Sequence, residues 1–207
     1  MFILDKIDTI RRGRCGSTVE TCSGRYVDVR HPDPATISRM DIAHALSMQC
    51  RFNGHVRNFY SVAEHCVRVA DHLPDSLRIH GLLHDAAEAY VGDVVTPVKR
   101  RLYGFSGMED RVLRAIYAHL QVPCPGETER GLVHQADLLA LREEAWALLP
   151  SQGRWHINAT YRQAIRPAMD DWPLQVVLCL APAAAKALWL ESLNEALGHS
   201  AYNVSRL

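Results

Sequence analysis

Histidine and carboxylate side chains recur in the otherwise apolar segment LLHDAAEAYVGD, residues 82–93. His84, Asp85 and Glu88 lie close together in it, and Asp93 ends it. An unpaired charge beside an apolar face is costly, so these groups need a compensating partner. Mixed nitrogen and oxygen ligands of this kind suit a divalent ion of the Zn, Mn, Co or Fe type. The segment therefore indicates a metal site.

A single helix could supply only part of such a site. With about 3.6 residues per turn, His84 and Glu88 are related as i, i+4, and Asp85 and Glu88 as i, i+3. The neighbours His84 and Asp85 diverge by about 100°, so both reach one ion only if other helices complete its shell. His65 and Asp137 lie among apolar residues elsewhere and are the best candidates. We therefore predict four ligands from three helices.

The elements that must position these ligands are expected to be helical. Apolar periodicity, helix caps and proline breaks predict six helices after a short strand or hairpin arm in RYVDV, residues 25–29. The helices are expected at 38–47, 61–73, 75–92, 107–120, 129–149 and 182–198. Ser61 and Glu64 have the spacing of a capping box, Pro74 should end the helix that they begin, and Gly92 should cap the next one. An all-α domain is predicted.

Length and apolar content suggest one domain over residues 1–150 and a C-terminal extension over 151–207, in which 150–180 is mostly irregular. The extension contains more apolar side chains than a short tail needs. They are Trp172, Val176, Val177, Leu178, Leu188, Trp189 and Leu193. A homo-oligomer, at least a dimer, is expected; the alternative is that the extension covers the core of its own chain.

Charge and cysteine content limit the classes of partner and the cellular compartment that the sequence favours. The 23 basic residues balance the 23 acidic residues of the chain, so nothing favours a nucleic-acid polymer or a membrane surface. The N-terminus reverses the order of a secretory signal, and no stretch has the length of a spanning helix. Six cysteines form no CxxC pair and are expected to be reduced. A cytoplasmic protein is predicted.

The order His65, His84-Asp85, Asp137 resembles the signature of the HD superfamily of metal-dependent phosphohydrolases, an all-α fold. The segments CRFNGHVRNFYSVAEHCVRVA and LLHDAAEAYVGDVVTPVK are similar to its compact branch, which contains bacterial 5′-deoxynucleotidases and phage or prophage deoxynucleotide phosphohydrolases. The resemblance covers about residues 38–145. It implies an HD-domain helical bundle, a small nucleotide substrate, and one divalent ion (Co, Mn, Zn, Fe or Mg) held by those four ligands.

The resemblance also implies roles for five further residues. Arg51 would contact phosphate, and Phe52 would lie beside the sugar and base, where the deoxynucleotidases have Trp. Glu88 would be the catalytic glutamate, Asp93 would lie near the reacting phosphate and sugar, and Lys99 would contribute from the TPVK loop. Phosphoester hydrolysis needs an activated water, a charge-gathering group and a proton for the leaving oxygen, and these side chains could serve those needs.

Several alternatives stay open. The motifs do not separate removal of one phosphate from a dNMP from removal of triphosphate from a dNTP. Alarmone hydrolases of the same fold usually follow the glutamate with aspartate, whereas Ala89 follows Glu88 here. Cyclic-dinucleotide phosphodiesterases of this superfamily usually add ligands for a second or third metal, and no pattern in this sequence demands one. A non-catalytic nucleotide-binding module would be expected to lose Glu88, Arg51 or a ligand. Closed structural zinc sites favour cysteine.

Overall fold

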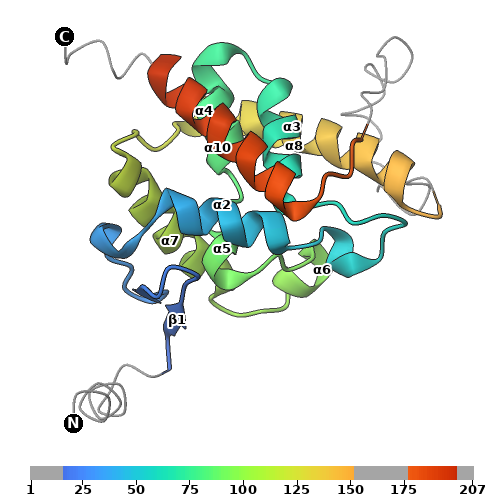
Figure 1. Cartoon of the computed structure of the whole chain (residues 1–207). Helices are drawn as coiled ribbons and strands as arrows, with labels where there is room; N and C mark the ends of the chain where they lie inside the picture. The colour runs from blue at the N-terminus through green and yellow to red at the C-terminus, as the bar shows by residue number, and fades with distance from the viewer. Residues whose placement is uncertain (1–15, 152–176, 200–207) are drawn as a thin grey trace.

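Helices make up most of the chain in the computed structural model, which describes residues 16–151 and 177–199 (Figure 1). Strands β1 (Thr18–Glu20) and β2 (Tyr26–Asp28) form an antiparallel hairpin. The α-helices are α2 (Arg39–Met48), α3 (Val62–Asp71), α4 (Arg78–Leu83), α5 (Glu88–Val91), α6 (Thr96–Lys99), α7 (Phe105–Leu120), α8 (Glu127–Leu148) and α10 (Pro182–His199). Short 3-10 helices are η1 (Pro34–Thr36), η2 (Phe52–Gly54) and η3 (Asp75–Leu77). The expected all-α class with a short N-terminal hairpin is confirmed.

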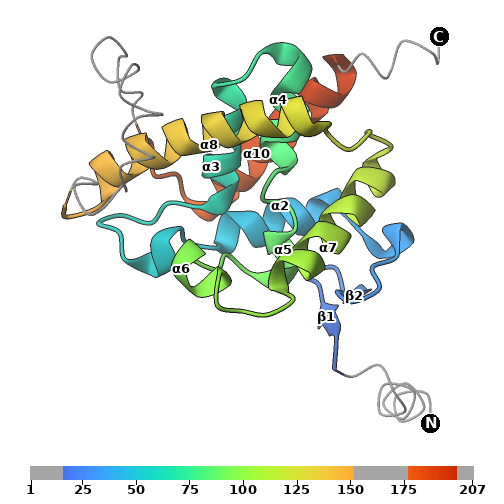
Figure 2. The same ribbon diagram turned by 180° about the vertical axis from the view of Figure 1, so that it is seen from behind.

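Helix α3 is the central helix of the fold. Every residue from Val62 to Ala70 is buried, and the helix packs against α2, α4, α8 and α10. Helices α10 and α8 cross α3 from opposite sides, α10 in front in Figure 1 and α8 in front in Figure 2. Ser61 caps α3 by accepting a hydrogen bond from the Glu64 backbone N at 3.1 Å, as the capping prediction required. The buried side chains of α3 are therefore surrounded by other helices.

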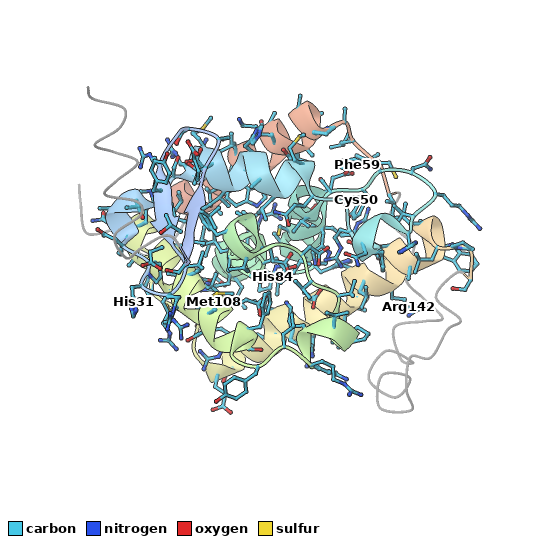
Figure 3. All side chains as sticks on the ribbon, turned by 90° about the horizontal axis from the view of Figure 1, so that it is seen from below. His31, Cys50, Phe59, His84, Met108 and Arg142 are labelled. Atoms are coloured by element: carbon cyan, nitrogen blue, oxygen red, sulfur yellow. The ribbon has the colours of Figure 1, made fainter. Side chains whose placement is uncertain are left out.

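Five of the six expected helices occur within two residues of their expected ends, but the helix expected over 75–92 is interrupted. It divides into η3, α4, a turn at 84–87, and α5. In the turn, Ala86 N donates to Leu83 O at 3.0 Å and Glu88 N to Asp85 O at 2.9 Å. Such i to i+3 bonds wind the chain more tightly than an α-helix. His84 and Asp85 thus belong to a break and not to a continuous helix, and His84 lies near the middle of the molecule (Figure 3).

One smaller difference and one confirmed prediction lie beside this break. Thr96–Lys99, expected in a loop, form the single helical turn α6, which has Pro97 at its start, where a missing N–H costs no hydrogen bond. Gly92 ends α5 with a φ of 84°, a backbone conformation that favours glycine, as its predicted capping role requires.

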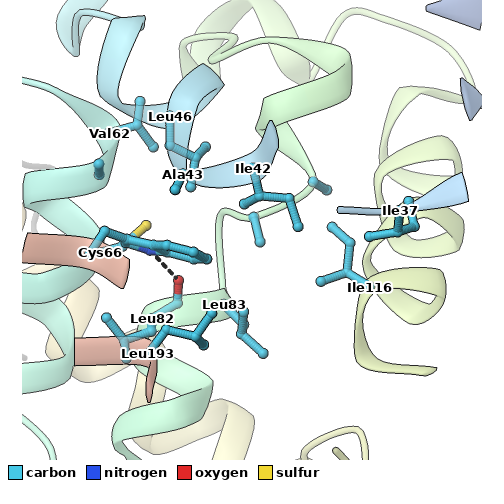
Figure 4. Packing of buried hydrophobic residues seen from close by; sticks show 14 of the residues in the cluster. Ile37, Ile42, Ala43, Leu46, Val62, Cys66, Leu82, Leu83, Ile116 and Leu193 are labelled. Atoms are coloured by element: carbon cyan, nitrogen blue, oxygen red, sulfur yellow. Dashed lines mark hydrogen bonds between the residues drawn. The ribbon is translucent and has the colours of Figure 1, made fainter. Parts of the chain in front are cut away.

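Helix α10 covers the core of its own chain. Trp189 and Leu193 are fully buried, and the Trp189 indole donates to Leu82 O at 3.2 Å (Figure 4). These two side chains therefore give no support to the homo-oligomer prediction, and the alternative that the sequence left open is correct for them. Leu188 and Val177 are half-buried and Leu178 is exposed, whereas Trp172 and Val176 lie outside the described residues. No helix in the described part is long and apolar enough to cross a membrane.

The hairpin is fastened to α2 by one carboxylate. Asp41 accepts hydrogen bonds from the Thr21 hydroxyl at 2.9 Å, the Cys22 thiol at 3.0 Å, and the Ser23 hydroxyl and backbone N at 2.7 and 3.1 Å. Burial opposes the ionisation of Asp41, but hydrogen bonds from these three residues outweigh burial and lower its pKa. Its charged form is therefore stabilised in the folded chain.

We expect Asp41→Ala to lower the free energy of unfolding at pH 7 by about 1–3 kcal/mol, since four donor groups from three residues lose a charged acceptor. Because the folded-state pKa of Asp41 is lowered, its contribution is present above the unfolded pKa of about 4 and is lost as the pH falls below that value. Urea unfolding at several pH values measures this. Asp75→Ala, on the surface, is the control and should change stability by less than about 0.5 kcal/mol; a similar loss in both variants would contradict the assignment.

Gly81 allows α4 to approach α3 closely. A Cβ atom at Gly81 would lie 2.8 Å from Ala70 Cα and 2.9 Å from Ala70 N. We expect Gly81→Ala to destabilise the fold by about 1–3 kcal/mol, because backbone atoms cannot move aside as a flexible side chain would. Thermal unfolding is the measurement. In Gly131→Ala the new methyl group meets nothing within 4 Å, so this control within α8 should be neutral or up to about 1 kcal/mol more stable.

Candidate metal centre

Three side chains from separate elements converge at the centre of the fold. His65 comes from α3, His84 from the turn after α4, and Asp137 from α8. The His65 Nε2 atom lies 3.2 Å from His84 Nε2 and 3.2 Å from Asp137 Oδ1. One ligand atom of each residue lies within 4.8 Å of the others, so the three residues could hold a metal ion.

The outer nitrogen of each imidazole is committed to an acceptor. His84 Nδ1 donates to Gly81 O at 2.7 Å, and His65 Nδ1 donates to Glu144 Oε1 at 2.7 Å. In the neutral rings both Nε2 lone pairs therefore face each other, an arrangement that requires a cation or proton between them. Two imidazoles and carboxylates without thiolate fit a divalent ion with positions left for water.

Asp85 completes the predicted ligand set. Its Oδ2 atom lies 3.1 Å from His84 Nε2 and 3.5 Å from His65 Nε2. Burial opposes protonation of His84, but the charge of Asp85 and hydrogen bonds with Asp85 and Cys66 together outweigh burial and raise the pKa of His84 well above its ordinary value. A proton thus competes with a metal ion for this position. The structure brings together all four residues that the sequence assigned as ligands.

Arg51 belongs to the same cluster, at the start of η2. Its Nε and Nη2 atoms each lie 3.1 Å from Glu144 Oε2, and Nη1 lies 3.7 Å from Asp85 Oδ2. Phe52 follows with its ring 5.6 Å from the guanidinium. Phe52 and Asn53 both have a φ of 55°, and Gly54 has a φ of 77°. A run of left-handed residues, two of them not glycine, is strained and persists only where surrounding contacts enforce it.

Glu88 lies at the base of a pocket of about 250 Å³ beside the ligands. The pocket is lined by His84, Asp85, Ala87, Glu88, Lys99, Glu109, Asp110 and Leu113. Glu88 is buried, and its Oε2 atom has no hydrogen-bond partner among the described residues. Burial, with the nearby charges of Asp85 and Asp93, raises the pKa of Glu88 to about 9. Glu88 is therefore suited to hold a proton and lacks a partner for one oxygen.

Lys99 and Asp93 flank Glu88. Lys99 Nζ lies 3.7 Å from Glu88 Oε1 and 2.8 Å from Glu109 Oε1. Gln49 bridges the backbones of Glu88 and Asp93. Its Nε2 atom donates to Glu88 O at 3.0 Å, and its Oε1 atom accepts from Asp93 N at 2.9 Å. Gln49 thus fixes both acidic residues through their backbone, a role that the sequence did not indicate.

A second pocket, of about 260 Å³, opens on the other side of His84 and reaches Asp137. Its remaining lining is mostly apolar and includes Leu113, Tyr117 and Val133. Of the metal candidates, His84 therefore lines both pockets, Asp85 lines the first and Asp137 lines the second.

Sequence reasoning also missed Glu144. It follows Asp137 by seven residues on α8, which is about two helical turns, so both side chains lie on the face toward α3. The spacing of seven residues from Asp137 within a predicted helix was therefore a signal by which Glu144 could have been found. The side chain is fully buried.

We expect Mn²⁺ or Zn²⁺ to raise the Tm of the protein, by an amount equivalent to about 2.7 kcal/mol at a hundredfold excess over Kd. His84→Ala should lose most of this shift, and the shift should shrink in acid because protons compete for the imidazoles. Thermal unfolding with and without EDTA measures it. His31→Ala, at an exposed position far from His84 in Figure 3, is the control; an undiminished shift in His84→Ala would refute the site.

Comparison with known proteins places the chain among relatives named as uncharacterized. No family model matches it. It is 33% identical over 184 residues to the uncharacterized protein YfdR of Escherichia coli strain K12, covering 86% of this chain and 95% of YfdR. It is 35% identical over 135 residues to the uncharacterized protein RCAP_rcc00048 of Rhodobacter capsulatus, covering 59% of this chain and 68% of that protein. The chain therefore belongs to the family of YfdR.

Proposed function

We propose that the protein hydrolyses the 5′-phosphate of a small deoxynucleotide with the help of one divalent ion. The observation that supports this best is the His65, His84 and Asp137 cluster beside a pocket lined by Glu88, a buried residue whose Oε2 atom has no hydrogen-bond partner among the described residues. A purely structural metal site would need neither the pocket nor a protonatable carboxyl group next to the ligands. The resemblance to HD phosphohydrolases adds support from the order of the ligands.

The side chains divide the chemistry as follows. A divalent ion, when bound, lowers the pKa of a water ligand and polarises a phosphoryl oxygen. Glu88 orients the attacking water or gives a proton to the leaving oxygen, for which its raised pKa suits it. Arg51 keeps Nη1 free of Glu144 and can contact a phosphate oxygen. Lys99 and Asp93 border the position of the substrate.

The charge of the pocket favours a monophosphate over a triphosphate. Four carboxyl groups line it, those of Asp85, Glu88, Glu109 and Asp110. The raised pKa of Glu88 keeps that group protonated near neutral pH, so three carboxylate charges remain, and Lys99 is the single lysine or arginine in the lining among the described residues. A triphosphate brings several negative charges toward these groups, whereas a monophosphate is better balanced by one ion, Arg51 and Lys99. We therefore rank dNMP hydrolysis ahead of dNTP hydrolysis.

The identity of the ion, the substrate class, the compartment and the oligomeric state are part of the proposal as well. The ion is one of Co, Mn, Zn, Fe or Mg, and the substrate is a free nucleotide, neither a nucleic-acid polymer nor a membrane component. A cytoplasmic homo-oligomer remains our expectation for the state of the protein.

The test is incubation of the metal-loaded protein with separate panels of dNMPs and dNTPs, followed by chromatography of the products. We expect inorganic phosphate and deoxynucleosides from the dNMP panel, and a loss of about 100-fold or more in kcat for Glu88→Ala. Triphosphate release would instead identify a dNTP hydrolase.

The matched control is Asp71→Ala, which removes a carboxylate paired with Arg78 on the surface at 2.9 Å and should keep parental activity. Alarmones and cyclic nucleotides complete the substrate panels. If no panel turns over, or if Glu88→Ala is as active as the parent, the hydrolase proposal fails and a nucleotide-binding module takes its place.

A further inference from the structure

We propose that Glu144 is a positioning residue that couples the occupancy of the metal centre to the binding of an anion by Arg51. This inference rests on the metal centre of the proposed function and adds to it a residue outside the ligand set. It concerns metal and phosphate affinity, so it can be tested whether or not the protein hydrolyses nucleotides.

The first part of the proposed coupling is the hydrogen bond between Glu144 and His65, a candidate metal ligand. Glu144 Oε1 accepts from His65 Nδ1 at 2.7 Å and from the Tyr60 hydroxyl at 3.1 Å. Glu144 is fully buried, so water does not compete for these bonds. A carboxylate in this place holds His65 in the tautomer whose Nε2 lone pair faces the other ligands, and it makes the imidazole a stronger donor to a cation.

The second part of the proposed coupling is the hydrogen-bonded ion pair between Glu144 and Arg51. Glu144 Oε2 accepts from both Nε and Nη2 of Arg51 at 3.1 Å, which fixes the plane of the guanidinium. The remaining nitrogen, Nη1, lies 3.7 Å from Asp85 Oδ2. Two carboxylates thus share Arg51, and one of them, Asp85, is a candidate ligand. A cation that engages Asp85 weakens its attraction for Nη1, while Glu144 keeps the guanidinium in position.

The consequence is a reciprocal effect between two ligands. With a metal bound, Nη1 is more available to an anion, so phosphate should bind more tightly with the metal than without it. By linkage, phosphate must raise the affinity for metal by the same factor. Direct attraction between metal and phosphate contributes to this effect as well, but that contribution does not pass through Glu144.

The neighbouring residue Glu143 provides a matched control. It is also buried and charged, and it pairs with Arg68 Nη1 at 2.7 Å and His72 Nε2 at 3.1 Å. These partners are none of the metal candidates. Replacing either glutamate by glutamine therefore removes a buried charge from the interface between α3 and α8, but only at position 144 does the change alter a direct partner of His65 and Arg51.

The experiment is titration calorimetry of Mn²⁺ into the full chain, with and without saturating inorganic phosphate, for the parent, Glu144→Gln and Glu143→Gln. We expect Glu144→Gln to weaken Mn²⁺ binding by about 10–100-fold and to reduce the gain in Mn²⁺ affinity that phosphate produces. Glu143→Gln should keep the parental values. Parental affinity and parental phosphate gain in Glu144→Gln, or equal losses in both variants, would overturn the proposal.

A second measurement covers the case in which Glu144→Gln does not fold. Nitrogen-15 NMR of the Zn²⁺-loaded parent reports the tautomer of each labelled histidine. The proposal requires His65 to carry its proton on Nδ1, and a proton on Nε2 would refute it. A protein that binds Mn²⁺ as expected but hydrolyses no nucleotide would refute the proposed function and leave the role of Glu144 standing.

Discussion

Helices α3 and α4 meet at Gly81, where a side chain would collide with the backbone of Ala70. The carbonyl group of the same glycine accepts the Nδ1 proton of His84. One residue therefore sets both the distance between the helices and the orientation of an imidazole. Because of this contact, the Nε2 atoms of His65 and His84 lie 3.2 Å apart. Two neutral imidazoles that both carry their proton on Nδ1 would not adopt this separation without a positive charge between them.

The interface between α3 and α8 is buried and charged. Arg68 and His72 face Glu143, while His65 and Arg51 face Glu144. Buried ion pairs add little net stability compared with well-packed apolar residues, because desolvation offsets their attraction. What the interface gains is fixed positions for nitrogen and oxygen atoms, which a functional centre needs and an apolar interface cannot provide.

The helices could be predicted because their periodicity, caps and prolines are local signals. The residues of the metal cluster could be found because His65 and Asp137 lie in such helices and His84 and Asp85 directly follow one. The turn at 84–87 could not be predicted. The spacing of apolar residues indicates which side chains are buried, but it does not distinguish i to i+3 hydrogen bonds from i to i+4 hydrogen bonds. Gln49 and Glu144 act through contacts with residues far away in the chain. For α10, its apolar pattern predicted a helix but not the surface that it covers.

Helix α10 joins parts of the chain that are far apart in sequence. Glu64 accepts from Leu180 N at 2.9 Å, and Trp189 donates to Leu82 O, across 116 and 107 residues respectively. Contacts of such high sequence separation slow folding, because chain entropy is lost before they form. On the ribosome, the apolar faces of α3 and α4 that α10 covers therefore stay uncovered until α10 has been synthesised.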